Sequence, residues 1–461
     1  MAKTNVIFIL ADDMGYGDFG MFSEGRTVTP ALDQMVSEGV CFTQSYAAAP
    51  VCVPSRAALL TGRYNHRTGA IDMRELRGLS NLATGETTIA DVFKQNGYAT
   101  GLMGKWHNGT IGAKYHPNAR GFDEFVGFRG GMSHYYNYRL YYNDTMHEFT
   151  DRYLTDHLTD ESVDFITRHK DGPFFLKIAY NAPHSPYEAP EEDIQMFHEM
   201  SKGEYTRAVS ATYAMILAMD RGIARIFETL KKLDLDDNTI VLFTSDNGPQ
   251  FGGQGENCSD RFNCNLRGAK ADVFDGGIRV PAVLRWPGKL KAGAMEDCFV
   301  HGIDWFPTLL AAAGIKPPGH LNIDGQNILP VLTGETEKSD VRRFWQWNRY
   351  APEVTCNAAM RHGKWKLVRP PIPEGMAIDR NDWNTDRIVE RDPEAYTENI
   401  NPPFPERTMP PPEPPLLFDI ENDPCELNDL AAKHPDRAQQ MLTELEAWFN
   451  EVEAERQAIQ S

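Results

Sequence analysis

The stretch NVIFILADD, residues 5–13, predicts a buried strand that ends at two carboxylates. Its apolar run is continuous rather than alternating, which is typical of a strand covered on both faces. Further runs of this kind follow along the chain: YATGLM (98–103), FFLKIAY (174–180), TIVLFT (239–244) and VPAVLRW (280–286). Because helical patterns separate these runs, we expect an α/β fold, with a large, mostly parallel sheet sandwiched by helices.

The pattern changes after residue 340. The runs RRFWQWN (342–348) and NAAMRHGKWKLVRP (357–370) predict a short antiparallel sheet. One face of a predicted terminal helix carries Leu442, Leu445, Trp448, Phe449 and Val452. We therefore expect a large α/β domain over residues 1–340 and a smaller C-terminal α+β domain over 341–461. The Pro-rich span 370–415 is either a linker or a loop laid over a cleft, and its composition favours the linker.

Composition excludes several classes of protein. Hydrophobic residues at 41% and charged residues at 24% of the 461 are typical of a folded globular chain, not of a disordered or fibrous one. The formal net charge of −19 disfavours nucleic acid and anionic membrane surfaces as partners. The apolar runs are far shorter than the roughly 20 residues needed to cross a bilayer.

The first residues, MAKTNVIFILADD, lack the apolar core and cleavage site of a signal peptide. As written, the chain is expected in the cytoplasm, although a periplasmic or secreted chain whose leader had been removed would look the same. Seven cysteines without regular spacing disfavour a disulfide scaffold. In an exported chain Cys258 and Cys264 could form a disulfide, but we favour their interpretation as reduced surface-loop thiols. Nothing in the sequence indicates an oligomeric state.

Polar side chains follow four of the predicted strands at the point where each strand ends. In chain order they are Asp12 and Asp13, Lys105 and His107, His184, and Asp246 and Asn247. Taken singly, each has an ordinary explanation as part of a turn or a helix cap. Because the carboxyl ends of parallel strands share one edge of a sheet, where ligands bind, the four segments together predict one cleft.

The acidic part of this group predicts a metal site. Asp12, Asp13, Asp246 and Asn247 offer only oxygen ligands, which suit calcium or magnesium. Zinc is disfavoured, because the set contains no imidazole, and no thiolate apart from that of the neighbouring Cys52.

Three cations join the cleft: Arg56, Lys105 and Lys270. A divalent metal with three carboxylates carries about −1, so the three cations bring the cleft to about +2 when its histidines are neutral. We therefore expect a small anionic substrate, held by charge-assisted hydrogen bonds. Arg56 lies one turn inside a predicted helix, and helix N-termini attract anions.

The segment CVPSR, residues 52–56, places a thiol at the start of that helix. One interpretation of Cys52 is an inert buried thiol, the common state of a free cysteine. A second is a thiolate nucleophile whose pKa is lowered by the helix N-terminus and Arg56. A thiolate is a poor partner for a hard cation, which suggests that residue 52 is not a thiol when it works.

In chain order, ILADDMGYGD (9–18), CVPSRAALLTGR (52–63), GKWH (104–107), APHSP (182–186), SDNG (245–248) and LRGAKADVFDGGIRVP (266–281) form a pattern. It resembles the type I, formylglycine-dependent sulfatases of the alkaline phosphatase superfamily. Residues 52–63 match the family signature CxPSRxxLLTGR, which is highly specific, and LLFDIENDPCELNDLA (416–431) is similar to the closing segment of the family. The resemblance spans most of the chain and implies an alkaline-phosphatase-like fold with a mixed, mostly parallel sheet.

The resemblance implies that Cys52 is a precursor. In the family, this cysteine is oxidised after translation to formylglycine by a maturase, and Cys52, Pro54 and Arg56 match the positions that the maturase reads. Residue 52 then joins the oxygen ligands of the metal, which the resemblance implies to be calcium, with magnesium as the alternative.

The resemblance also implies a role for each remaining polar group. One hydroxyl of the hydrated aldehyde attacks sulfur while Lys105, Lys270 and His184 hold the sulfate. His184 protonates the departing alcohol, and His107 deprotonates the second hydroxyl so that inorganic sulfate leaves. Arg56 steadies the hydrate. These roles describe an enzyme that hydrolyses sulfate monoesters.

The sequence determines the substrate less closely than it determines the reaction. Removal of terminal sulfates from a small sulfated saccharide is preferred, and an aryl or steroid sulfate is the alternative. The tract 135–142 and residues 342–349 contain aromatic side chains that could contact a sugar or an aromatic leaving group. Because the spacing departs from the family pattern near GFRGGMSHYYNYRL (127–140), Ser133 and His134 receive no role.

Two other functions remain open. A phosphatase or phosphodiesterase of the same superfamily would need a serine or threonine nucleophile and usually two zinc ions with more histidines. A non-catalytic protein that captures sulfated ligands would require an unconverted Cys52.

Overall fold

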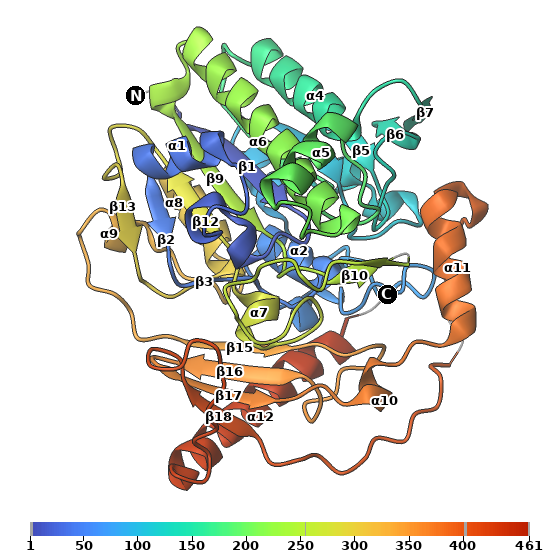
Figure 1. Ribbon diagram of the computed structural model, residues 1–461, viewed down its shortest axis with the longest axis vertical. Coiled ribbons are helices and arrows are strands. Elements are labelled where there is room, and N and C mark those ends of the chain that lie inside the picture. Colours follow the sequence, from blue (N-terminus) through green and yellow to red (C-terminus); the bar gives the residue numbers. More distant parts are fainter. Residues whose placement is uncertain (1–2, 254, 401–402, 460–461) are drawn as a thin grey trace.

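The computed structural model describes residues 3–253, 255–400 and 403–459. Its main sheet has ten strands in the order β13-β2-β12-β9-β1-β8-β4-β5-β6-β7 (Figure 1). The strands are β1 (Asn5–Ala11), β2 (Val40–Phe42), β4 (Ala99–Lys105), β5 (Glu124–Phe128), β6 (Tyr138–Tyr142), β7 (Thr145–Phe149), β8 (Phe174–Ala179), β9 (Thr239–Ser245), β12 (Ala282–Arg285) and β13 (Ala294–Glu296). The central strands β9, β1, β8, β4 and β5 are parallel, whereas β12, β6 and β7 run antiparallel to their neighbours. The expected mixed, mostly parallel sheet is confirmed.

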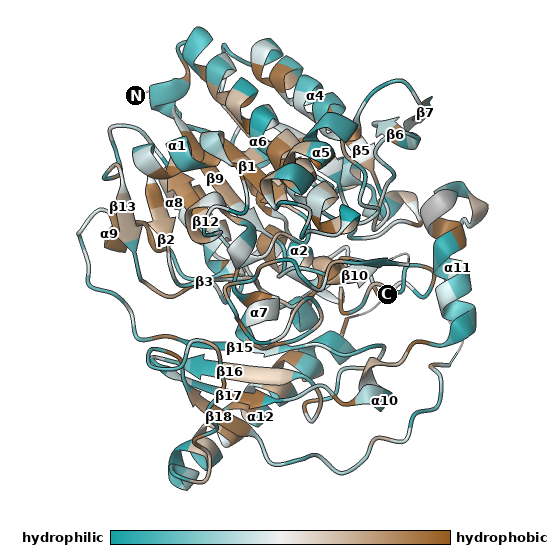
Figure 2. Ribbon diagram, viewed as in Figure 1, coloured by the Kyte–Doolittle hydropathy of each residue, from teal (hydrophilic) through white to brown (hydrophobic). Residues whose placement is uncertain are grey.

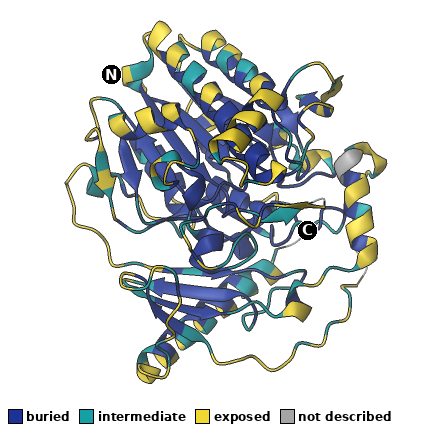
Figure 3. Ribbon diagram, viewed as in Figure 1, coloured by how far each residue is buried: buried dark blue, intermediate teal, exposed yellow. Residues whose placement is uncertain are grey.

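Helices cover both faces of this sheet because the central strands are apolar on both sides. In β1, Ile7 and Ile9 belong to one hydrophobic core and Phe8 and Leu10 to the other. The first face is covered by α1 (Pro30–Glu38), α4 (Leu154–Arg168), α5 (Glu191–Met200) and α6 (Arg207–Lys232). The second face is covered by α2 (Cys52–Thr61), α3 (Ile89–Gln95) and α8 (Trp305–Ala312). In Figures 2 and 3 the central strands are hydrophobic and buried, and many exposed hydrophilic residues lie on the outer helices.

The C-terminal part forms a four-stranded antiparallel sheet, in the order β15-β16-β17-β18. Its elements are β15 (Arg342–Gln346), β16 (Ala358–His362), β17 (Trp365–Arg369), β18 (Leu416–Asp419), α10 (Pro373–Met376), α11 (Arg380–Arg391) and the terminal helix α12 (Pro435–Gln457). Met360 and Leu367 of this sheet pack against α12, while Trp345 and Val368 pack against Tyr46 of the large unit. The sheet is thus sandwiched between its own helix and the first unit.

Short elements complete the chain. They are β3 (Ser45–Tyr46), β10 (Gly252–Gly253), β11 (Glu256–Asn257), β14 (Val300–His301), α7 (Asp275–Ile278) and α9 (Leu329–Leu332). None of the helices within the described ranges combines the length and apolar character required to span a membrane.

Two expectations need correction. The Pro-rich span is not simply an extended linker, because it contains α10 and α11, and α11 lines the cleft that holds Cys52. Cys258 is free, as expected, but it is buried beside Thr212 instead of lying on the surface, since the loop that carries it folds back onto α6.

Candidate active site

The ends of four parallel strands position most of the candidate residues. Asp12 and Asp13 follow β1, and Asp246 and Asn247 follow β9. Lys105 is the last residue of β4, and His107 comes two residues later, whereas His184 lies in the loop after β8. Cys52 and Arg56 belong to the first turns of α2, and Lys270 precedes α7. The structure brings the ten sequence-predicted residues together at the carboxyl edge of the sheet, as a doubly wound topology requires.

Unusual backbone conformations aim two of these side chains. Asp13 has a φ of 63° and His107 a φ of 56°. Left-handed conformations of this kind are uncommon for residues other than glycine and concentrate at functional sites. They turn the chain sharply where β1 and β4 end.

Four ion pairs join the carboxylates to the cations, the longest of them between Arg56 Nη2 and Asp12 Oδ1 at 3.5 Å. Lys105 Nζ lies 2.7 Å from Asp12 Oδ2, and Lys270 Nζ lies 2.8 Å from Asp13 Oδ2. Arg56 Nη2 lies 2.7 Å from Asp246 Oδ2, and its Nε donates to the same oxygen at 2.8 Å. All of these side chains are nearly or fully buried, so each charge depends on its partners.

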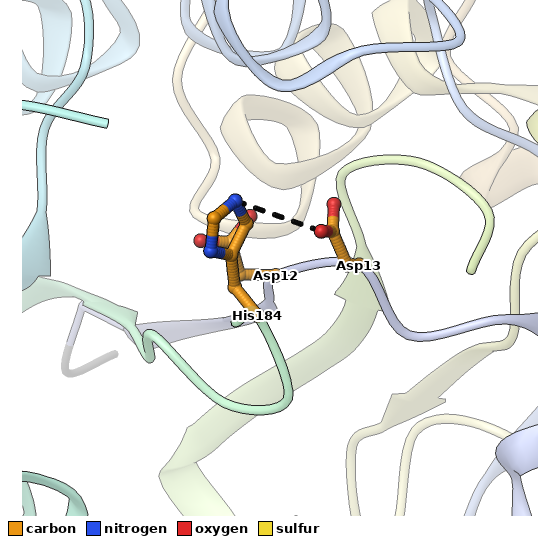
Figure 4. Close-up of side chains that lie close together, drawn as sticks. All are labelled: Asp12, Asp13 and His184. Carbon is orange, nitrogen blue, oxygen red and sulfur yellow. Dashed lines mark ion pairs between the residues drawn. The ribbon is translucent and has the colours of Figure 1, made fainter. Parts of the chain in front are cut away.

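The donor set fits a hard cation. Oxygen Oδ1 of Asp12 and Oδ1 of Asn247 are buried and accept no hydrogen bond from the described residues, although such atoms are normally satisfied. Ligand atoms of Asp12, Asp13 and His184 lie within 4.8 Å of one another, and Figure 4 shows His184 Nε2 facing Asp13 Oδ2 at 3.6 Å. Oxygen ligands in this number suit calcium or magnesium. His184, which the sequence did not suggest as a neighbour of the metal, borders the group.

Burial and nearby cations lower the pKa of both histidines. Burial, followed by Lys270, lowers the pKa of His184 to about 3. Burial, followed by Lys105, lowers the pKa of His107 to about 4. Burial alone would raise the pKa of Asp13, but Lys270 and His184 outweigh it and hold that pKa below its usual range. Both imidazoles are therefore neutral at neutral pH.

The protonation of each imidazole follows from its neighbours. His184 Nδ1 lies 2.6 Å from the carbonyl oxygen of Ser185, so Nδ1 carries the proton and Nε2 faces Asp13. His107 Nε2 lies 3.3 Å from Glu75 Oε1, and its buried Nδ1 has no hydrogen-bond partner among the described residues. With Nε2 donating to Glu75, Nδ1 of His107 is available to accept a proton.

Cys52 opens α2 at the floor of a cavity of about 390 Å³. The cavity is also lined by His107, His184 and Lys270. Cys52 itself is 1% exposed, and its Sγ lies 3.4 Å from Met73 Sδ. Among the described residues of α2, Cys52 alone lines this cavity.

Several residues of the cavity were missed by the sequence analysis. They are Met73, Arg74, Gln250, Trp383, Asp386 and Arg387. Arg349, which also lines the cavity, ends the segment 342–349 that the sequence analysis considered for substrate contact. The segment RNDWNTDRIVER (380–391) could have been recognised as an amphipathic helix, because Trp383 and Arg387 are four residues apart.

The two aromatic segments that were considered for substrate contact lie in different environments. Trp345 is buried, and its indole donates to the Ala47 carbonyl oxygen, so it belongs to the packing between the two sheets. Tyr138 and Tyr141 line a second cavity, of about 460 Å³, together with Ser133 and His134.

Comparison with known families identifies two matching models. Residues 4–315 match the family described as Sulfatase, and residues 269–374 match that described as N-sulphoglucosamine sulphohydrolase, C-terminal. The chain is 34% identical to the uncharacterized sulfatase YdeN of Escherichia coli (strain K12), over 72% of this chain and 66% of that protein. It is 35% identical to N-acetylgalactosamine-6-sulfatase of Homo sapiens, over 71% of this chain and 65% of that protein. These matches thus span about two thirds of each relative.

A solved structure resembles the whole chain. The crystal structure of Ps i-CgsB in complex with k-i-k-neocarrahexaose superposes with a TM-score of 0.80 at 31% sequence identity. The similarity covers 97% of this chain and 92% of that one, so it extends over both the large unit and the C-terminal part.

Proposed function

Because the chain belongs to the sulfatase family, we propose that it is a sulfuric ester hydrolase that releases inorganic sulfate from a sulfated carbohydrate. The observation that carries this proposal is the convergence of Cys52, His107, His184 and Lys270 on one cavity. Buried carboxylates beside it supply a site for a hard cation. The cavity thus combines a nucleophile position, proton donors and acceptors, and positive charge.

The nucleophile is proposed to be formylglycine made from Cys52. As its hydrate, formylglycine would supply one oxygen that attacks sulfur and a second hydroxyl whose deprotonation expels sulfate. A cation held by Asp12, Asp13, Asp246 and Asn247 would supply positive charge that favours the ionised nucleophile and the bound sulfate. Pro54 and Arg56 are buried in the folded chain, so a maturase that reads CVPSR is expected to act before this segment folds.

Two lysines would hold the sulfate oxygens. Lys105 and Lys270 now face Asp12 and Asp13. Lys270 lines the cavity and can turn its remaining N–H groups toward an anion there. Lys105 is fully buried and does not line the cavity, so its contact with the sulfate stays a prediction. Arg56 reaches Asp246 with two nitrogen atoms and therefore orients that carboxylate within the cation site.

The histidines would move the protons. His107 Nδ1 is neutral and without a hydrogen-bond partner among the described residues, which suits a base that takes the proton of the second hydroxyl. His184 would protonate the leaving alcohol oxygen through Nε2. Burial, followed by Lys270, lowers the pKa of His184, and a bound sulfate that offsets the charge of Lys270 would raise this pKa.

A carbohydrate substrate is supported by two observations. The structural relative named above is a complex with a carrahexaose, and the human relative is named for an amino sugar sulfate. The cavity beside Cys52 has Arg74, Arg349 and Gln250 in its wall, and polar side chains of this kind suit sugar hydroxyls better than a steroid. We propose that the enzyme is exo-acting and removes the sulfate of a terminal sugar.

The proposal is tested by sulfate release from protein made together with a formylglycine-generating maturase. Wild type is expected to turn over at least one monosulfated hexose or hexosamine, while Cys52→Ala loses at least about a thousandfold in kcat/KM. Cys41→Ala, at another buried cysteine, serves as the matched control and keeps its activity. Mass spectrometry of the peptide that contains residue 52 is expected to find formylglycine in wild type.

Metal dependence is measured on the same protein. A chelator is expected to abolish sulfate release, and added calcium or magnesium is expected to restore it. The proposal is wrong if fully matured protein releases no sulfate from any sugar or aryl sulfate, with either cation present.

A further inference from the structure

A second cavity adjoins the one that holds Cys52. It has a volume of about 460 Å³, and Met132 and Arg387 line both cavities. A ligand larger than one sugar can therefore extend from the Cys52 cavity into the second one without leaving the protein surface.

Helix α11 forms the boundary between the two cavities. Three polar contacts fix it to the loop beside Cys52, and a fourth fixes it to Tyr350. Arg74 Nη1 lies 2.6 Å from Asp386 Oδ2, and Arg77 Nε lies 2.8 Å from Asp382 Oδ2. The backbone N–H of Leu76 donates to Asp386, and the hydroxyl of Tyr350 donates to Asp382. In Figure 1, α11 accordingly stands beside the large unit, away from the four-stranded sheet.

Asp382 and Asp386 anchor α11, and Asp386 also lines the Cys52 cavity. Trp383 and Arg387, which are four residues apart, both line the Cys52 cavity. The Trp383 side chain is 49% exposed, which is unusual for so large an apolar group. An exposed indole beside a polar cavity offers a flat surface on which a sugar ring can stack.

Arg387 supplies a positive charge at the junction of the cavities. Within the described part of the chain, it makes no ion pair, whereas the neighbouring Arg129 pairs with Glu394 and Arg139 with Glu148. A guanidinium of this kind suits a sulfate or a carboxylate, which it can bind with two parallel hydrogen bonds.

We propose that Trp383 and Arg387 form a subsite for the sugar next to the sulfated one, and that this neighbouring sugar carries an anionic group. The inference rests on the proposed sulfatase function and narrows its substrate to an oligosaccharide with a second sulfate ester or a carboxylate. Trp383 stacks on the neighbouring ring, and Arg387 binds the anion. The terminal sugar occupies the Cys52 cavity, and the remainder of the chain continues past Arg387 into the second cavity.

Binding to an inactive protein tests the subsite separately from catalysis. Cys52→Ala is titrated with a monosulfated monosaccharide, a disaccharide sulfated only on its terminal sugar, and matched disaccharides whose second sugar carries a sulfate or a carboxylate. One or both of the doubly anionic disaccharides are expected to bind at least about fivefold more tightly than the singly anionic one, and adding Arg387→Ala is expected to remove that difference. Equal affinity of all three disaccharides would overturn the subsite.

Turnover provides the second readout. Arg387→Ala is expected to lower kcat/KM for the preferred doubly anionic disaccharide about fivefold more than for the monosaccharide, chiefly through KM, while Arg387→Lys retains most of the difference. Trp383→Ala is expected to lower kcat/KM for every disaccharide more than for the monosaccharide. Arg380→Ala, at an exposed arginine of the same helix that lines neither cavity, is the matched control and leaves all values unchanged.

The failures of the two proposals are distinguishable. If wild type turns over no sulfate ester while Cys52→Ala still selects the doubly anionic disaccharide through Arg387, the function fails and the subsite stands. If wild type hydrolyses all sugars with equal kcat/KM, and Arg387→Ala lowers all values alike, the subsite is wrong and the function stands. Thermal unfolding of each variant shows whether a loss of binding or of activity is due to misfolding.

Discussion

Lys177 is a buried charge that the proposed chemistry does not use. It lies in the middle of β8, is 1% exposed, and has its Nζ 5.5 Å from the centre of the Phe8 ring. Burial, with a smaller contribution from Arg56, lowers the pKa of Lys177 to about 7. An unfolded lysine has a pKa near 10.4, so between pH 7 and 10 the unfolded chain holds a proton that the folded chain has released.

This difference in bound protons decides whether a rise in pH stabilises or destabilises the folded chain. Because the unfolded state binds more protons in that window, raising the pH from 7 to 9 is expected to stabilise wild type by about 2 kcal/mol through this group. Lys177→Met is expected to be more stable than wild type at pH 7, with an advantage that shrinks toward pH 9. Urea unfolding at both pH values measures it, with exposed Lys232→Met as control. If the free energies of unfolding of Lys177→Met and wild type differ by the same amount at both pH values, the lowered pKa of Lys177 is contradicted.

At the scale of the element, β4 depends on a glycine at its end. Gly104 has a φ of 114°, and a Cβ at this position would lie 2.0 Å from the carbonyl oxygen of Ala179 on β8. The close approach of the two strands, and the turn that follows, carry Lys105 toward Asp12 and His107 toward the cavity. Only glycine accommodates both the conformation and the contact.

Gly104→Ala is therefore expected to separate β4 from β8 and to lower the free energy of unfolding by about 2 to 4 kcal/mol. Sulfate release is expected to fall with it, because Lys105 and His107 move together. Gly172→Ala, where a new Cβ meets nothing within 4 Å, provides the control. Denaturant unfolding and sulfate release are measured on both variants, and an unchanged Gly104→Ala protein would rule out this account of the strand end.

At the scale of the molecule, a buried ion cluster joins the two units. Lys366 of β17 is fully buried, with its Nζ 2.7 Å from Asp275 Oδ1 of α7 and 2.8 Å from Glu426 Oε1. The backbone N–H of Asp275 also donates to Glu426. This cluster holds the C-terminal sheet, and with it Arg349 and α11, against the cavity of the large unit.

Lys366→Met removes the cation that pairs with buried Glu426 and leaves Asp275 only the more distant Arg279, at 3.9 Å, so we expect a loss of about 3 to 5 kcal/mol in stability. Activity on oligosaccharides is expected to fall as well, because Trp383 and Arg387 depend on the docking of the second unit. Lys364→Met, which removes a half-exposed ion pair with Asp419, is the matched control and costs at most about 1 kcal/mol. Thermal and denaturant unfolding distinguish the two variants; equal stability would show that the cluster does not hold the units together.

Local sequence determined the large sheet and the proposed reaction centre. Continuous apolar strands can only be buried on both faces, so the layers follow from residues such as those of β1. The polar residues that follow these strands meet at the carboxyl edge of the sheet, regardless of how the connecting loops fold. Asp12, His184 and Asp246 could therefore be grouped without a structure. Cys52 was identified by its own signature, which needs no distant residue.

Only the tertiary structure decided the rest of the cavity. The composition of residues 370–415 indicates only a Pro-rich segment. It does not show that Asp382 and Asp386 pair with arginines about 300 positions earlier in the sequence. The same holds for Lys366, whose two partners come from separate segments. Contacts of this kind depend on how two folded units dock, and a local sequence pattern carries the period of a helix or strand but not its distant partner.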